Sequence, residues 1–167
     1  MTDSASTDGL VLVSHGDRGV IELPDGRRVD GRFRRSVGRP FCGDRVRLER
    51  ADGQSYVVTE IHPRRNVFAR ADKRRRKQVI AANLDQGLIV IAPAPAPSID
   101  LVERYLVAIH GLGIQPVIVV NKAELLDHAA IEDGPLAHLD DYRELGYAVV
   151  ATSCKGPPGI DELRPVL

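Results

Sequence analysis

The chain has 167 residues, of which 43% are hydrophobic and only 4% are aromatic, and it contains no tryptophan. This composition is that of a globular protein with one domain or two small ones. The sequence shows no apolar run of transmembrane length and no charged stretch followed by an apolar one at its start. The cysteines, Cys42 and Cys154, are too far apart in sequence to form a metal-ligand pair. We therefore expect a cytoplasmic protein with reduced thiols.

Formal charge divides the chain into two halves. Residues 1–80 contain 18 Lys or Arg against 11 Asp or Glu, whereas residues 81–167 contain 5 against 12. A net charge of zero therefore conceals a basic half and an acidic half. This asymmetry predicts two modules and, for the first, a polyanionic partner such as nucleic acid. The alternative is a solvated basic surface of an arginine-rich protein, without such a partner.

The first module is predicted to be a small β-barrel over residues 9–68. Residues 1–8 are small and polar, and we expect them to be disordered. Turn signals such as Pro24-Asp25-Gly26 separate five short β-like segments. These segments cover residues 9–15, 19–23, 27–36, 46–48 and 56–61. Five short strands favour a closed barrel of the OB-fold type, which often binds oligonucleotides. Aromatic residues are few here, so phosphate contacts should supply most of any RNA affinity.

The densest basic run of the chain follows the expected barrel. Because residues 69–82 lie between the two modules, the run could be only a solvated linker. Its concentration of cations favours instead an arm that contacts RNA phosphates. The RNA-binding candidates are therefore Arg64, Arg65, Lys73, Arg74, Arg75, Arg76 and Lys77.

From residue 83 onward the pattern changes to alternating strands and helices. Residues 87–92, 117–120 and 147–151 are expected to be strands, and the β-branched run at 117–120 suits a sheet covered on both faces. Ser98 can cap a helix that begins at Ile99 and has one apolar face. A shorter helix is expected over residues 136–145. This β-α-β-α-β order predicts parallel strands with right-handed crossovers.

Polar residues follow the strand at 117–120 directly, at the edge where open α/β sheets bind ligands. Asn121, Lys122 and Glu124 have the spacing Asn-Lys-x-acid, which resembles the guanine-recognition motif of GTPases, although the usual acid is Asp. A carboxylate can accept hydrogen bonds from N1–H and the exocyclic amine of guanine, a donor pair that adenine lacks. The lysine stem can lie along the base, and the asparagine amide can join neighbouring loops. The alternative is an ordinary helix start, capped by Asn121 with Glu124 in the first turn.

A second polar loop follows the third strand. Ser153, Cys154 and Lys155 stand where GTPases carry a Ser-Ala-Lys loop, which offers a backbone N–H to guanine O6. Because that contact uses the backbone, Cys can replace Ala. Taken alone, the loop is also ordinary turn chemistry. Its position at a strand's carboxyl end predicts that it lies beside the Asn121 loop.

The motifs together resemble one family. They are Cys42–Val46, Pro63–Asn66, Ala82–Gln86, Arg104–Leu106 and the two polar loops. The combination is similar to the ribosome small-subunit-dependent GTPases of the RsgA/YjeQ family, from about Gly9 to Leu167. The resemblance implies an OB-fold that binds rRNA of the small ribosomal subunit, a circularly permuted Ras-like domain that hydrolyses GTP with Mg²⁺, and a zinc-binding tail. It makes RNA, not DNA or a membrane, the expected partner.

In such a permuted domain the guanine loops precede the phosphate-binding loop. The 167 residues contain no Gly-x-x-x-x-Gly-Lys-Ser/Thr, no Asp-x-x-Gly for magnesium and no Cys/His cluster for zinc. Phosphoryl transfer depends on such phosphate and metal contacts. We therefore expect residues 83–167 to be the amino-terminal half of the GTPase domain, with the carboxyl-terminal part as a partner, and to bind no GTP tightly alone. The alternative is a non-catalytic RNA-binding adaptor with a degenerate GTPase-like half-domain.

Overall fold

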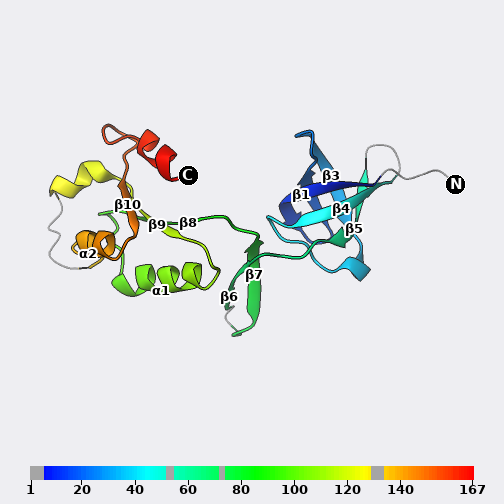
Figure 1. Ribbon diagram of the computed structural model, residues 1–167, viewed down its shortest axis with the longest axis horizontal. Coiled ribbons are helices and arrows are strands. Elements are labelled where there is room, and N and C mark those ends of the chain that lie inside the picture. Colours follow the sequence, from blue (N-terminus) through cyan, green and yellow to red (C-terminus); the bar gives the residue numbers. More distant parts are fainter. Residues whose placement is uncertain (1–5, 52–54, 72–73, 129–133) are drawn as a thin grey trace. The chain divides into compact units, whose positions relative to one another are not determined.

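In a computed structural model of the chain, the structure describes residues 6–51, 55–71, 74–128 and 134–167. The chain divides into two compact units, Met1–Leu84 and Asp85–Leu167 (Figure 1). The change of pattern expected at residue 83 thus falls within two residues of the division. No helix in the described ranges is both long enough and apolar enough to cross a membrane.

The first unit begins with a closed barrel of five strands in the order β1-β2-β3-β5-β4. The strands are β1 (Ser6–His15), β2 (Arg18–Glu22), β3 (Arg28–Phe33), β4 (Arg45–Arg50) and β5 (Tyr56–Ile61), with a 3₁₀ turn η1 (Arg35–Val37) after β3. Strand β1 pairs antiparallel with both β2 and β4, and β3 pairs parallel with β5, which closes the barrel. The predicted OB-fold barrel is confirmed.

Strand β1 begins earlier than the sequence predicted. Ser6 pairs with Glu49 and Asp8 pairs with Arg47 of β4, so residues 6–8 are ordered rather than disordered. The Asp8 carboxylate also lies 3.2 Å from His62 Nε2, which adds a polar contact to the ladder. Partner strand β4 supplies this order, and the polar composition of the segment gave no sign of it. The remainder of the expected disordered tail, residues 1–5, lies outside the described residues.

Alternating apolar side chains fill the barrel. The core residues are Val11, Ile21, Leu23, Phe33, Val46, Leu48 and Val58. Gly19 lies where β2 approaches β1 closely, beside an irregularity in the pairing between Val11 and Val13. A Cβ atom there would lie 2.1 Å from the carbonyl oxygen of Val13, so no larger residue fits without moving the backbone.

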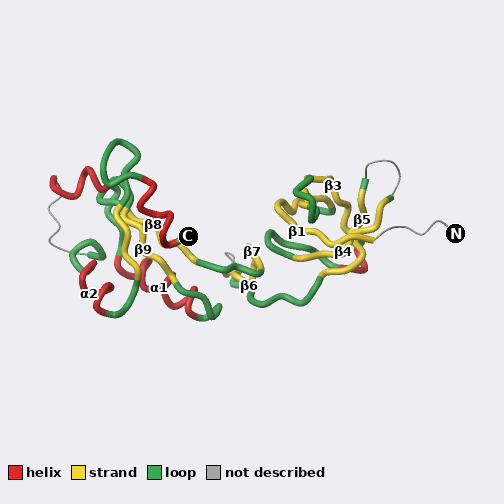
Figure 2. The backbone as a smooth tube through the Cα atoms, turned by 45° about the horizontal axis from the view of Figure 1, so that its top comes forward, coloured by secondary structure: helices red, strands yellow, loops and turns green. Residues whose placement is uncertain are grey.

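The basic run is a folded hairpin and not the predicted linker. Strands β6 (Val67–Ala71) and β7 (Lys77–Ala82) pair antiparallel, and Figure 2 shows them as strands between longer loops. Their apolar and β-branched residues, such as Phe68 and Val79, favour a strand. The density of charge in the intervening turn concealed this signal. Lys73 lies outside the described residues.

The second unit is built on a parallel sheet in the order β10-β9-β8. Its elements are β8 (Gly87–Ile91), α1 (Ile99–His110), β9 (Pro116–Val120), η2 (Ala123–His128), α2 (Leu139–Glu144), β10 (Ala148–Ala151) and η3 (Ile160–Val166). The predicted β-α-β-α-β order is confirmed. Helix α2 is shorter than the expected 136–145, because the residues before Leu139 form turns.

Helix α1 covers one face of this sheet. Ser98 caps it, since its Oγ accepts a hydrogen bond from the backbone N–H of Leu101 at 3.3 Å. The core comprises Ile89, Ile91, Val102, Leu106, Ile109, Ile118, Val120 and Tyr142. All five residues of β9 are buried, as its β-branched sequence predicted. Strand β8 pairs with β9 along one edge, and its Leu88 and Val90 side chains are exposed by 38% and 61%.

Candidate functional site

The two predicted guanine loops meet at the carboxyl edge of the parallel sheet. Ser153, which follows β10, donates a hydrogen bond from its Oγ to Oε2 of Glu124, which follows β9, at 2.6 Å. The backbone N–H of Ala123 also donates to the carbonyl of Thr152 at 3.0 Å. The adjacent parallel strands place these loops side by side. The structure therefore brings together the residues that the two motifs supplied separately.

Glu124 is held as a charged acceptor. Lys155 Nζ lies 3.9 Å from Glu124 Oε1, and the side chain of Glu124 is 25% exposed. The hydrogen bond from Ser153 is the largest cause that lowers the pKa of Glu124, and the positive charges of Lys155 and Lys122 lower it further. The carboxylate is consequently ionised at neutral pH, the form that accepts hydrogen bonds from a base.

Asn121 and Lys122 tie together the loops around this carboxylate. The backbone N–H of Asn121 donates to Ile91 of β8 at 2.8 Å, and its side-chain Oδ1 accepts from the backbone N–H of Lys122 at 2.8 Å. Lys122 has a φ of 57° and donates from Nζ to the carbonyl of Ala94 at 2.6 Å. The alternative of a helix start is met in part, because the 3₁₀ helix η2 has Glu124 in its first turn, whereas Asn121 Oδ1 accepts from the N–H of Lys122, which precedes that helix.

The Ser153 loop presents a backbone donor. Ser153 is buried, its own N–H donates to the carbonyl of Pro158, and its Oγ accepts from the backbone N–H of Lys155 at 3.0 Å. Cys154 is exposed, and within the described ranges its backbone N–H has no protein acceptor. This is the amide that a Ser-Ala-Lys loop offers to guanine O6. The side-chain change from Ala to Cys leaves it in place.

The described ranges do not contain a metal site. No group of three or more His, Cys, Asp or Glu residues in them lies close enough to hold an ion.

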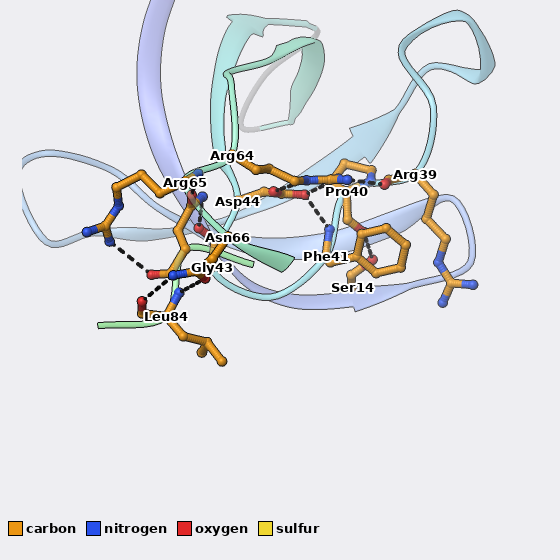
Figure 3. Close-up of polar contacts among 11 residues, drawn as sticks. Ser14, Arg39, Pro40, Phe41, Gly43, Asp44, Arg64, Arg65, Asn66 and Leu84 are labelled. Atoms are coloured by element: carbon orange, nitrogen blue, oxygen red, sulfur yellow. Dashed lines mark hydrogen bonds and ion pairs between the residues drawn. The ribbon is translucent and has the colours of Figure 1, made fainter. Parts of the chain in front are cut away.

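In the first unit, a buried carboxylate pairs with Arg64, one of the predicted RNA-binding residues. Asp44 is fully buried, and Arg64 donates to its two oxygens from Nε and Nη2, both at 2.7 Å (Figure 3). The backbone N–H of Phe41 also donates to Asp44 at 2.7 Å. The hydrogen bonds from Arg64 to Asp44 raise the pKa of Arg64. Arg64 therefore has a structural role, as one arm of a bidentate ion pair.

Two asparagines join the start and the end of the hairpin. Asn66 and the backbone of Leu84 exchange two hydrogen bonds of 2.8 Å each. Asn83, at a φ of 55°, accepts from the backbone N–H of Arg65 at 2.8 Å and donates to the carbonyl of Gly43 at 2.9 Å. Arg65 also donates from its side chain to the carbonyl of Asn83. Arg65 is thus a second candidate whose side chain has a structural contact.

The hairpin packs directly on the barrel through these residues. The backbone N–H of Ala82 donates to the carbonyl of Cys42 at 2.9 Å. Gly43 has a φ of 86°, and a Cβ atom on it would lie 2.0 Å from the carbonyl oxygen of Ala82. Only glycine permits this approach. The motifs at 42–46, 63–66 and 82–86 are therefore one junction, a role that sequence reasoning missed because no local pattern links segments so far apart.

Of the predicted RNA-binding residues, the ones at the tip of the hairpin stay accessible. Arg74, Arg75 and Arg76 are exposed in the turn, and Lys77 is exposed at the start of β7. The backbone of Arg75 has a left-handed conformation, with a φ of 58°. Arg65, near the barrel, is exposed as well, so the tip residues differ from it in position and not in exposure.

The chain thus has a barrel of the OB type, followed by a parallel sheet with two polar loops that meet at its carboxyl edge. The family model described as RsgA GTPase matches residues 61–167. The chain belongs to the RsgA GTPase family.

Relatives and solved structures agree with this assignment. The chain is 36% identical to the small ribosomal subunit biogenesis GTPase RsgA of Neisseria meningitidis (strain FAM18) over all of the chain and 51% of that protein. It is also 36% identical to that of Saccharophagus degradans, over 95% of the chain and 49% of that protein. The chain thus spans about half the length of the curated relatives it matches.

Two crystal structures share the fold. The structure of YjeQ from Thermotoga maritima superimposes with a TM-score of 0.74 and 25% identity, covering 98% of this chain and 57% of that one. The structure of YloQ, a circularly permuted GTPase, has a TM-score of 0.70 at 23% identity, covering all of this chain and 58% of that one. The predicted family and fold class are confirmed.

The Asp44–Arg64 pair generates a prediction about stability. Asp44→Ala should lower the free energy of unfolding of the first unit by about 3 kcal/mol, because it leaves the Arg64 guanidinium and the Phe41 N–H without their acceptor. Urea denaturation followed by circular dichroism measures this change. Asp25→Ala is the matched control, since it removes an exposed ion pair with Arg27 and should barely alter stability. Equal effects of the two substitutions would contradict a structural role for the pair.

Proposed function

We propose that this chain supplies the RNA-binding unit and the guanine-recognising half-site of a GTPase that acts in the cytoplasm on the small ribosomal subunit. The names of its relatives support this proposal. In the whole protein, GTP and Mg²⁺ would be bound together with a phosphate-binding loop, and a zinc-binding tail would follow.

The contact between Ser153 and Glu124 carries the guanine part of the proposal. It holds a charged carboxylate, whose pKa is lowered, in the same pair of loops as the backbone N–H of Cys154, which has no acceptor among the described residues. The carboxylate would accept from N1–H and the exocyclic amine of guanine, and the Cys154 amide would donate to O6. Adenine has an acceptor at N1 and a donor amine at C6, and it carries no amine at C2. The aliphatic stem of Lys122 would lie along the base, since its ammonium is already bound to Ala94.

The phosphates would be bound elsewhere in the whole protein. Positioning and neutralising a triphosphate requires a cradle of amides, a lysine and a metal ion. We infer that the carboxyl-terminal part provides these groups and packs along β8. The exposure of Leu88 and Val90 on that strand supports this inference, because an apolar strand edge favours pairing with a further segment.

RNA binding is proposed for the tip of the hairpin. Arg74, Arg75, Arg76 and Lys77 are exposed together, and Lys73 belongs to the same run. The Asn66 contact joins the two ends of this hairpin and the Asn83 contact ties it to Gly43, so its cations are presented on a supported element rather than on a free chain. Phosphate contacts of this kind tolerate many sequences and weaken as salt rises.

The 167-residue chain should bind GMP weakly, with a dissociation constant on the order of millimolar, and should bind AMP less well. Two or three charge-assisted hydrogen bonds favour the base, but the entropy of association offsets much of that gain. Glu124→Ala should abolish the preference for GMP, whereas Glu124→Asp should retain it. Titrations followed by NMR chemical shifts of the Cys154 and Glu124 amides measure both ligands.

The pH dependence of this preference follows from the lowered pKa of Glu124. The preference should persist at neutral and mildly acidic pH, where the carboxylate is ionised, and be lost as the pH falls through its lowered value. The same discrimination by the wild type and Glu124→Ala would remove Glu124 from the site. Binding of GTP at micromolar affinity by this chain alone would contradict the half-site.

A triple substitution of Arg74, Arg75 and Arg76 by Gln tests the RNA part. Affinity for a single-stranded oligoribonucleotide should fall, and the slope of log K against log salt should decrease in magnitude by about 2, since each phosphate contact contributes about 0.7. Fluorescence anisotropy at several salt concentrations measures the slope.

The matched control replaces three exposed cations of the second unit by Gln, namely Arg104, Arg143 and Arg164. It changes net charge by the same amount and should leave the slope nearly unaltered. Identical slopes for both triple variants would show that the hairpin has no particular part in RNA binding.

A further inference from the structure

A cavity of about 440 Å³ lies where the hairpin meets the barrel. It is lined by Arg39, Phe41, Arg76, Lys77, Gln78 and Val79, which include three cations and no carboxylate. Its size lies within the range of small-ligand sites. Its charge favours an anion. It shares Arg76 and Lys77 with the proposed RNA-binding tip and adds Arg39 and Phe41, to which no role was assigned above.

The walls of this cavity are fixed by the junction. Cys42 bridges Ala81 in parallel, so the segment that carries Arg39 and Phe41 runs beside β7. Pro40 is fully buried, and its carbonyl accepts a hydrogen bond from Ser14 Oγ at 2.6 Å. Figure 3 shows Arg39, Pro40 and Phe41 on this segment. The cavity is therefore formed between two supported backbone segments, and its geometry needs no ligand to assemble it.

Two arginines lie against the ring of Phe41, and one of them, Arg64, is paired with a carboxylate. The Cζ atom of Arg64 is 5.1 Å from the ring centroid, and that of Arg39 is 5.7 Å from it. Asp44 neutralises Arg64, whereas no carboxylate in the described ranges pairs with Arg39 or with Lys77. Arg39 thus offers a planar cation supported by an aromatic ring. Unstacked bases of RNA stack on such guanidinium planes.

We propose that this cavity binds one unpaired nucleotide of RNA. Its phosphate lies against Lys77, and its base stacks against Arg39 where Phe41 supports it. Gln78, whose Oε1 accepts from Arg70 Nε at 3.4 Å, keeps its amide N–H₂ for an acceptor on the base edge. A base in a duplex is stacked on its neighbours and cannot enter. The proposal rests on the proposed RNA binding of the first unit and adds to it a preference for unpaired nucleotides.

Arg39→Lys and Arg39→Ala separate stacking from charge. The probes are a fluorescein-labelled twelve-nucleotide oligouridylate and a labelled RNA duplex of twelve base pairs, and anisotropy measures both affinities. Arg39→Lys keeps the charge but removes the plane, so it should weaken binding of the single strand at least about fivefold and leave duplex binding within about twofold. Arg39→Ala should weaken the single strand further. Arg164→Ala, which removes an exposed cation of the second unit paired with Asp161, is the control and should alter neither affinity.

The outcomes distinguish this inference from the function it rests on. Equal loss of single-strand and duplex affinity in Arg39→Lys, or no loss of either, overturns the nucleotide pocket while RNA binding by the hairpin stands. A wild-type chain that binds neither probe overturns both. Phe41→Leu provides a second variant, because loss of the aromatic support should reproduce the effect of Arg39→Lys without any change in charge. A Phe41→Leu variant that binds the single strand like the wild type also contradicts the pocket.

Discussion

The buried carboxylate of Asp44 is the constraint on which the first unit depends. Burying an ionised carboxylate costs free energy unless an opposite charge and hydrogen bonds compensate it. Arg64 donates to both oxygens of Asp44, and the N–H of Phe41 donates a third hydrogen bond. The backbone of Asp44 and Gly43 pairs with Val11 of β1. One residue thereby joins the barrel, the segment that carries Phe41 and the chain that enters the hairpin.

The second unit also depends on hydrogen bonds to a carboxylate, that of Glu124. Its loops contain few apolar residues, and hydrogen bonds between loops hold the Glu124 carboxylate in place. Ser153 fixes the carboxylate, Asn121 continues the ladder from Ile91, and Lys122 reaches the carbonyl of Ala94. The strands supply the registry, because consecutive parallel strands end at one edge of the sheet. The half-site that we propose for a base is therefore held by three strands and the loops that follow them.

Local pattern predicted much of this architecture. The β-branched run of β9 and the Ser98 cap of α1 are signals contained in a few neighbouring residues, and both are confirmed. The guanine loops could be paired in advance for the same reason, since the strand order places them. By contrast, Arg64 belongs to the densest basic run of the chain yet pairs with Asp44, which lies 20 residues earlier. The hairpin was missed because charge was weighed above the strand propensity of its flanks. Phe41 and Arg39 gave no signal, since their cavity exists only where two distant segments meet.

We propose that the chain associates with the small ribosomal subunit, and co-sedimentation tests this association most directly. The 167-residue chain is mixed with purified small or large subunits and centrifuged through a sucrose cushion at low and at physiological salt. The account predicts that the chain sediments with small subunits in preference to large ones, and that this association weakens as salt rises. Equal recovery with both subunits, or no recovery with small subunits at low salt, would contradict it.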